Sequence, residues 1–284
     1  MRAERERPGW YLAPAALLLG IVTLYPLAHV VWLSLERRSL LDPAPPRFIG
    51  LDNYLRLAGD ERFWNALGNT LYFVGVSVSL ELALGLAFAL AVQRPFRGRA
   101  ALYGVILLPW AVPTAVSARM WEWMYNSEIG VLNYLLGAQV NWLGSPAWAL
   151  NAAILMDVWK STPFVALLLV AGLQGIPRDL YRAAEVDGAT RWTVLRRITL
   201  PLLAPVILVA LIFRTIDAFR VFDSIYVLTG GGPANSTETL SIYAYKALFQ
   251  SLEFGYGSTL AVSVFACVAL AAGAYAILLR KFLR

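Results

Sequence analysis

Nine ionisable side chains lie within or at the edges of the apolar segments of this chain, where charged residues are uncommon. Such groups are costly in lipid, so they are expected to face a cavity or to pair with one another. Eight of them form pairs of opposite sign three residues apart, a spacing that brings side chains together on a helix. These pairs are Arg119 with Glu122, Asp157 with Lys160, Arg214 with Asp217, and Arg220 with Asp223. The ninth, Glu81, has no neighbour at helical spacing, and we expect it to pair with a residue of another helix.

Two of these segments combine charge with other features of a sugar site. Residues 157–163 end in Pro163, which predicts a helix broken in mid-membrane. Residues 213–223 place three phenylalanines among the charges. Carboxylates and guanidinium groups exchange hydrogen bonds with sugar hydroxyls, while aromatic faces stack on the apolar side of a sugar ring. Asp157 and Asp217 therefore either contact a sugar or only pair between helices.

A third contributor is the stretch of residues 108–114, which contains two prolines and predicts a doubly broken helix. Proline-interrupted helices that meet polar groups are where a transporter's midplane site is expected.

The composition indicates an integral membrane protein. Of the 284 residues, 59% are hydrophobic and 15% are charged, whereas a soluble domain carries roughly 25% charge. One cysteine, Cys267, excludes a disulfide framework and a cysteine-based metal site. The sequence has no Gly-x4-Gly-Lys-Ser/Thr phosphate loop, so we do not expect this chain to bind and hydrolyse ATP by itself.

Six apolar segments reach the roughly 20 residues that a helix needs to cross a bilayer core. They are residues 10–35, 66–92, 101–125, 149–173, 202–228 and 258–279. The first is too long for the core of a signal peptide and lacks a small-residue cleavage site, so it is expected to be retained. The predicted fold is all-α, one polytopic domain over residues 1–284 with six transmembrane helices and both termini on the same side.

Basic residues predict which side that is, because arginine and lysine concentrate in cytoplasmic loops. The side that holds both termini carries 14 of them, and the opposite loops carry six. The 14 are Arg2, Arg5, Arg7, Arg94, Arg97, Arg99, Arg178, Arg182, Arg191, Arg196, Arg197, Arg280, Lys281 and Arg284. We expect a multi-pass protein of the cell (inner) membrane with both termini in the cytoplasm.

The longest polar interruption of the second half, residues 177–201, lies between two membrane-length segments. Pro177 suits the first position of a helix, and Gly188 suits its end or a bend. Leu180, Ala183 and Ala184 recur at helical spacing and predict a small-residue face that docks a partner. The alternative is a basic helix that lies on anionic lipid.

This loop resembles the EAA loop of binding-protein-dependent ABC importers. The family form is Glu-Ala-Ala, three residues, Gly, nine residues, Ile, one residue and Leu-Pro, and here the spacing from Ala183-Ala184 through Gly188 to Ile198 and Leu200-Pro201 holds throughout. Arg182 stands where the family has its leading Glu; this departure leaves the docking role intact but does not indicate which ion pair the loop makes with its partner. Leu228–Pro233 is similar to an outer loop of the same family.

The resemblance covers nearly the whole chain and is strongest to the sugar permeases of trehalose/maltose-type systems, with a type I (MetI/MalF-like) transmembrane fold. It implies sugar contacts at Trp110, Thr114, Asp157, Lys160, Ser161, Asp217, Ala218 and Val221. We add Arg214 and Arg220 because they lie on the charged helix segment. It implies an ATPase-coupling role for Leu180, Arg182, Ala183, Ala184, Asp187 and Gly188.

The same resemblance implies a homologous second permease subunit, two cytosolic ABC ATPases and an extracytoplasmic sugar-binding protein, without a nucleic-acid partner. It implies no cofactor or metal on this chain, with ATP and Mg held by the ATPases. The predicted activity is import of a sugar, such as trehalose or maltose, rather than catalysis. Alternatives are glycerol 3-phosphate or another oligosaccharide as substrate, a secondary transporter, or a structural or signalling membrane protein.

Overall fold

The computed structural model describes residues 9–93 and 97–282, with side chains at 12–93 and 97–278. The chain forms two compact units. One comprises the residues up to Asp60 together with Tyr243–Ser263, and the other comprises Glu61–Ile242 and the residues from Val264 onward. Arg2, Arg5, Arg7, Arg94 and Arg284 lie outside the described residues, as do the side chains of Arg280 and Lys281, so the charge distribution between the two sides stays a prediction.

The membrane-spanning prediction is confirmed in outline. Five helices among the described residues are long and apolar enough to cross a membrane, and a bent pair makes six if it is one span. The five cover Leu12–Ser34, Glu61–Gln93 (α4), Pro146–Gln174 (α8), Arg191–Phe219 and Phe254–Leu278. The first of these combines α1 (Gly9–Leu19), a π-helical turn (Gly20–Leu24) and α2 (Tyr25–Ser34). The last lies within α14 (Phe254–Phe282).

The predicted span 101–125 is not one straight helix. It divides into α5 (Arg99–Ala111) and α6 (Thr114–Met124), which are bent by 97° at the break. Val112 adopts an extended conformation there (φ −76°, ψ 134°), as expected of a residue that precedes a proline. Of the two prolines that predicted breaks, only Pro113 breaks the helix, because Pro109 lies inside α5.

The predicted span 202–228 is also divided. Helix α11 (Leu200–Phe219) ends before Arg220, and a separate short helix, α12 (Asp223–Leu228), follows a turn. By contrast, the break predicted at Pro163 is wrong, because α8 continues through this residue. Pro163 is buried together with Ser161 and Thr162, and the Thr162 hydroxyl donates to the Val158 carbonyl at 2.6 Å. The proline is thus accommodated within a packed, continuous helix.

The shorter elements lie in the connections. They are β1 (Glu36–Arg37), β2 (Arg47–Phe48), α3 (Asp52–Ala58), α7 (Val131–Leu136), α9 (Arg178–Val186), α10 (Arg191–Val194), a π-turn (Leu195–Thr199), α13 (Leu240–Tyr245) and a π-turn (Lys246–Gln250). The strands pair antiparallel, with Glu36 opposite Phe48.

In the first unit, the start of α14 is fastened to the strand region. The N–H of Gly255 donates to the Arg38 carbonyl at 3.0 Å, and the Asp60 carboxylate accepts hydrogen bonds from the hydroxyls of Tyr243 and Tyr256. Arg56 forms an ion pair with Glu253 at 2.8 Å. These polar contacts hold together segments that are almost 200 residues apart in the sequence.

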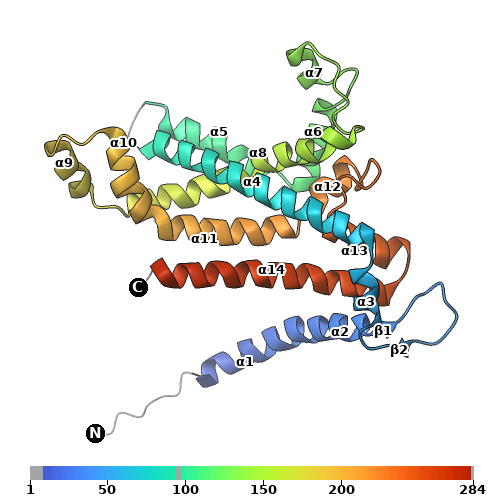
Figure 1. Ribbon diagram of the computed structural model, residues 1–284. Helices are drawn as coiled ribbons and strands as arrows, with labels where there is room; N and C mark the ends of the chain where they lie inside the picture. The colour runs from blue at the N-terminus through green and yellow to red at the C-terminus, as the bar shows by residue number, and fades with distance from the viewer. Residues whose placement is uncertain (1–8, 94–96, 283–284) are drawn as a thin grey trace, which may run out of the picture. The chain divides into compact units, whose positions relative to one another are not determined.

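In the second unit, α4, α8 and α11 run alongside one another (Figure 1). Two glycines allow the close approach. A Cβ built on Gly85 of α4 would lie 2.8 Å from the Val165 Cγ1 and 3.1 Å from the backbone nitrogen of Ala166 on α8. A Cβ on Gly172 would lie 2.7 Å from the Leu203 side chain on α11. Small residues at such crossings let helix backbones approach closely in membrane proteins.

The Gly85→Ala substitution is expected to lower the melting temperature of the purified protein. Its added methyl group overlaps the α8 backbone, and overpacking typically costs about 1–3 kcal/mol. The matched control is Gly75→Ala on the same helix, where a Cβ meets nothing within 4 Å. That variant should be neutral or slightly stabilising, because alanine favours a helix over glycine by about 0.5–1 kcal/mol. Equal melting temperatures for the two variants would contradict this close packing.

Candidate functional site

A buried arginine joins the three central helices. The guanidinium of Arg214, on α11, donates from Nη2 to the Glu81 Oε1 at 2.8 Å and from Nε to the second oxygen of the same carboxylate on α4. It also donates to Asp157 on α8, with Nη2 to Oδ2 at 3.0 Å. Its Nη1 donates to Asp217, one turn further along α11. We call these four residues the Arg214 cluster.

Exposure increases across the Arg214 cluster in one direction. The side chains of Glu81 and Arg214 are 0% and 5% exposed, that of Asp157 is 13% exposed and that of Asp217 is 67% exposed. The cluster thus has a closed end at Glu81 and an open end at Asp217. Three acidic side chains therefore surround one guanidinium. Among the residues that the structure describes, no group of acidic, histidine or cysteine side chains is arranged to hold a metal ion.

Lys160 supplies a second cation but makes a different contact. Its ammonium donates to the backbone carbonyl of Val112 at 2.5 Å. This carbonyl lies at the break between α5 and α6, where the helix can no longer supply a partner for it. Lys160 therefore supplies a partner for the carbonyl at the break. The prediction that Lys160 forms an ion pair with Asp157, which was based on their spacing, is wrong.

An aromatic row connects α5, α8 and α11. Trp110 stacks on Phe164, with ring centroids 6.1 Å apart, and Phe164 meets Phe213 edge-on at 6.4 Å. Trp110 is half exposed, at 51%, so its ring presents an apolar face. Phe213 precedes Arg214 in the sequence, and Phe164 lies four residues after Lys160 on α8. The row thus shares α8 and α11 with the Arg214 cluster.

The comparisons with known proteins identify the family of the chain. Residues 82–284 match the family model for the binding-protein-dependent transport system inner membrane component. The trehalose/maltose transport system permease protein MalF of Thermococcus litoralis is 47% identical over 261 residues, which cover 90% of this chain and 88% of the relative.

The chain belongs to this family.

One further relative and one solved structure are also similar to this chain. The sulfoquinovosyl glycerol transport system permease protein SmoG of Agrobacterium fabrum is 43% identical over 259 residues, covering 90% of this chain and 84% of that protein. A chain of the crystal structure of a bacterial ABC transporter involved in the import of alginate superimposes with a TM-score of 0.83 and 23% identity, and the match covers 98% of both chains. The all-α fold of an ABC importer's transmembrane subunit is confirmed, as is the prediction of a permease subunit whose ATPase activity lies in partner subunits.

The structure brings some predicted residues of the permease together and separates others. Asp157, Arg214 and Asp217 meet in one cluster. Ala218 is buried, and Arg220 is exposed beyond the end of α11. Because α11 ends at Phe219, Arg220 and Asp223 are not on one helix, and no ion pair joins them within the described part of the chain.

Two other predictions about pairing are confirmed. The Arg119–Glu122 pair is confirmed, with an N–O distance of 2.6 Å. The expectation that Glu81 pairs across helices is also confirmed. The sequence did not indicate Glu81 or Phe164 as part of the site. A lone carboxylate inside an apolar span was the available signal for Glu81.

The loop predicted to couple to the ATPases forms a short exposed helix, α9, that ends as expected. Gly188 adopts a left-handed conformation (φ +69°) just beyond it. The predicted small-residue face is not uniform, because Leu180 and Ala183 are exposed whereas Ala184 is buried against the chain itself. Arg182, at the position of the family Glu, forms an exposed ion pair with Asp179 at 3.3 Å.

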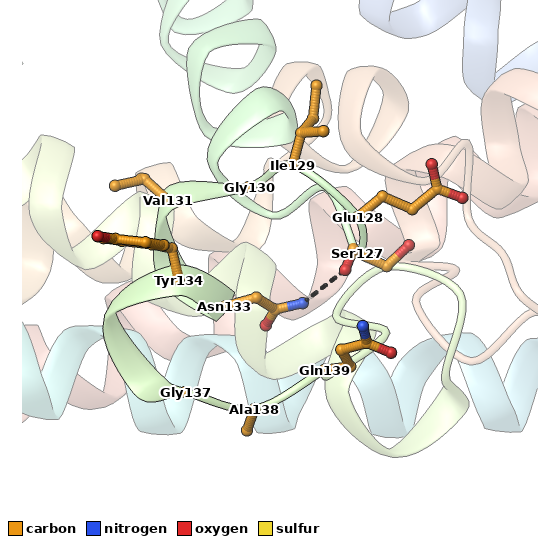
Figure 2. Close-up of a pocket in the computed structure, with 10 residues that line it drawn as sticks. All are labelled: Ser127, Glu128, Ile129, Gly130, Val131, Asn133, Tyr134, Gly137, Ala138 and Gln139. Carbon is orange, nitrogen blue, oxygen red and sulfur yellow. Dashed lines mark hydrogen bonds between the residues drawn. The ribbon is translucent and has the colours of Figure 1, made fainter.

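A separate pocket of about 610 Å³ lies in the connection between α6 and α8. Ten of the residues from 127 to 139 line it, and Asn133 organises its wall by donating to the Ser127 carbonyl at 3.1 Å (Figure 2). None of the residues predicted to bind substrate lines this pocket. It consists of one loop and its short helix, α7.

The Lys160→Met substitution is expected to destabilise the permease, because the Val112 carbonyl then loses its partner. Leaving a partly buried carbonyl unpaired typically costs about 1–3 kcal/mol. Thermal unfolding followed by size-exclusion chromatography measures the loss. Arg220→Met is the control, since it removes an exposed cation from the same unit. If both variants have the same melting temperature as the wild type, Lys160 does not stabilise the break.

Proposed function

We propose that this permease carries a neutral disaccharide such as trehalose or maltose into the cytoplasm, and that the open end of the Arg214 cluster contacts it. The 47% identity to a trehalose/maltose permease over 90% of the chain is the observation that supports this substrate class most directly. Carboxylates accept hydrogen bonds from sugar hydroxyls, and an exposed indole stacks on a sugar ring. Asp217 and Trp110 offer these two groups.

The proposal assigns a role to each residue that was predicted to contact the substrate. Asp157, Asp217 and Ser161 offer oxygens, Trp110 and Thr114 lie on the two sides of the helix break, and Lys160 holds that break. Ala218, Val221 and Arg220 lie where α11 ends and the chain turns. We assign Arg214 to the support of the two aspartates rather than to direct contact, because its donors are already engaged by carboxylates.

The charge of the cluster favours a neutral sugar over an anion. Asp217 presents its carboxyl group at the open end of the cluster, Arg214 is engaged by acidic side chains, and Lys160 directs its ammonium to a backbone carbonyl. At an effective dielectric constant of about 20, two like unit charges 4 Å apart repel by about 4 kcal/mol. Glycerol 3-phosphate is disfavoured for this reason. A sulfonated glycoside is the second candidate, because SmoG is named for sulfoquinovosyl glycerol transport.

Transport is proposed to follow from movement of whole helices rather than from chemistry on this chain. The partners are a homologous second permease, two ATPases with their ATP and Mg, and an extracytoplasmic sugar-binding protein. ATP closes the ATPase dimer, and α9 passes that motion to the helices, so that the pathway faces outward and accepts the sugar. Both termini and α9 are placed in the cytoplasm, following the excess of basic residues on that side.

Co-purification of the tagged permease with the products of its neighbouring genes tests this proposal. We expect an ATPase to co-purify and to be stimulated by trehalose or maltose when the binding protein is present. A panel that includes glycerol 3-phosphate and a sulfonated glycoside separates the substrate classes. Stimulation only by an anionic substrate would overturn the assignment to neutral sugars. The absence of any associated ATPase would overturn the importer assignment.

The coupling loop provides a matched pair of variants for the same assay. Gly188→Pro is expected to abolish sugar-stimulated ATPase activity, because proline cannot adopt the φ of +69° and loses the N–H that donates to the Glu185 carbonyl. Gly188→Asn should retain most activity, because asparagine tolerates this conformation and a Cβ there meets nothing within 4 Å. Full activity in the proline variant would show that the loop does not couple.

A further inference from the structure

Glu81 is the most enclosed member of the Arg214 cluster. Its side chain has no exposed surface, and both of its carboxylate oxygens accept hydrogen bonds from the Arg214 guanidinium. It lies on α4, whereas the residues proposed to contact sugar lie on α5, α6, α8 and α11 or just beyond α11. Glu81 therefore lies behind the residues proposed to contact the sugar, in direct contact with Arg214.

The geometry of the guanidinium gives this contact a consequence for the two aspartates. A guanidinium is planar, and its donors point in fixed directions. When Glu81 engages Nε and Nη2 in a two-point contact, the plane of the group is set. The remaining donors, on Nη1 and Nη2, then point to Asp217 and Asp157. The carboxylate on α4 thus determines where the arginine holds the carboxylates on α8 and α11.

Without Glu81, Arg214 would have two carboxyl partners instead of three, and its guanidinium would be free to rotate. Its guanidinium would turn toward Asp157 and Asp217 and engage more of their oxygen atoms. Those oxygens would then be less available to accept hydrogen bonds from a sugar. Asp217 is 67% exposed while Asp157 is 13% exposed. The loss of hydrogen bonding to a sugar would therefore be largest at Asp217, at the open end of the cluster.

We propose that Glu81 is a positioning residue for sugar recognition, which acts through Arg214 to hold the carboxylates of Asp157 and Asp217 in place for the substrate. This inference rests on the proposed import of a sugar through the Arg214 cluster. It assigns a role in substrate preference to a residue on α4 that does not itself reach the substrate.

The test compares Glu81→Gln with wild type in proteoliposomes that contain the full transporter and saturating binding protein. Transport of trehalose and of maltose is measured together with ATPase activity in the absence of sugar. We expect the ratio of the two transport rates to change by about tenfold, which is the equivalent of one hydrogen bond to a charged group. The sugar-independent ATPase activity reports whether the variant transporter is assembled.

The matched control is Glu122→Gln, which removes the carboxylate of the exposed pair with Arg119. It should leave the ratio unchanged. A role of Glu81 in helix packing alone would lower both transport rates together, and an unchanged ratio in an assembled Glu81→Gln transporter overturns the proposal. If that variant does not assemble, Glu81→Asp replaces it, because the shorter carboxylate keeps the charge and shifts the guanidinium. An unchanged ratio with Glu81→Asp likewise overturns the proposal.

The wild-type arm separates this inference from the function on which it rests. If the wild type transports neither trehalose nor maltose, the proposed function fails and this inference fails with it. If the wild type transports them and the Glu81 variants keep its ratio, only the role of Glu81 fails.

Discussion

A guanidinium group among apolar helices is the constraint on which the central part of this permease depends. Arg214 is 5% exposed, and carboxylates from α4, α8 and its own helix engage it. Removing one partner from a buried ion pair typically costs about 3–5 kcal/mol, because the other charge is left buried and unpaired. The three helices must therefore keep the spacing at which these groups meet.

The apolar packing around the cluster serves that spacing. Gly85 lets α4 approach the backbone of α8, and Gly172 lets α8 approach Leu203 on α11. The aromatic row from Trp110 to Phe213 joins α5 to the same helices. Lys160 donates to the Val112 carbonyl at the break between α5 and α6. Polar groups thus fix the geometry, while small and aromatic residues allow the helices to reach it.

The sequence predicted the pairs that depend only on helical spacing. Arg119 meets Glu122 and Arg214 meets Asp217 because both members lie on one continuous helix. The three-residue spacing of Asp157 and Lys160 predicted a pair that does not form, because the guanidinium of Arg214 on another helix binds Asp157 instead. Local patterns contain no information on that competition.

Proline and helix ends show the same limit. Pro113 broke its helix and Pro163 did not, because Pro163 is buried in the packed centre of α8. The end of α11 at Phe219 was also not predicted, since the expected span continued to residue 228. The family resemblance supplied the fold and the location of the candidate site, while the partners of each charged group required the structure.

The most direct test of this account is a cryo-electron microscopy structure of the assembled transporter with its binding protein, sugar and ATP under conditions that block hydrolysis. The account predicts sugar density against the carboxylates of Asp157 and Asp217, with the Arg214 guanidinium still held by Glu81 behind them. Sugar density at a site remote from these carboxylates would contradict it. So would an Arg214 side chain that has left Glu81 and binds the sugar directly.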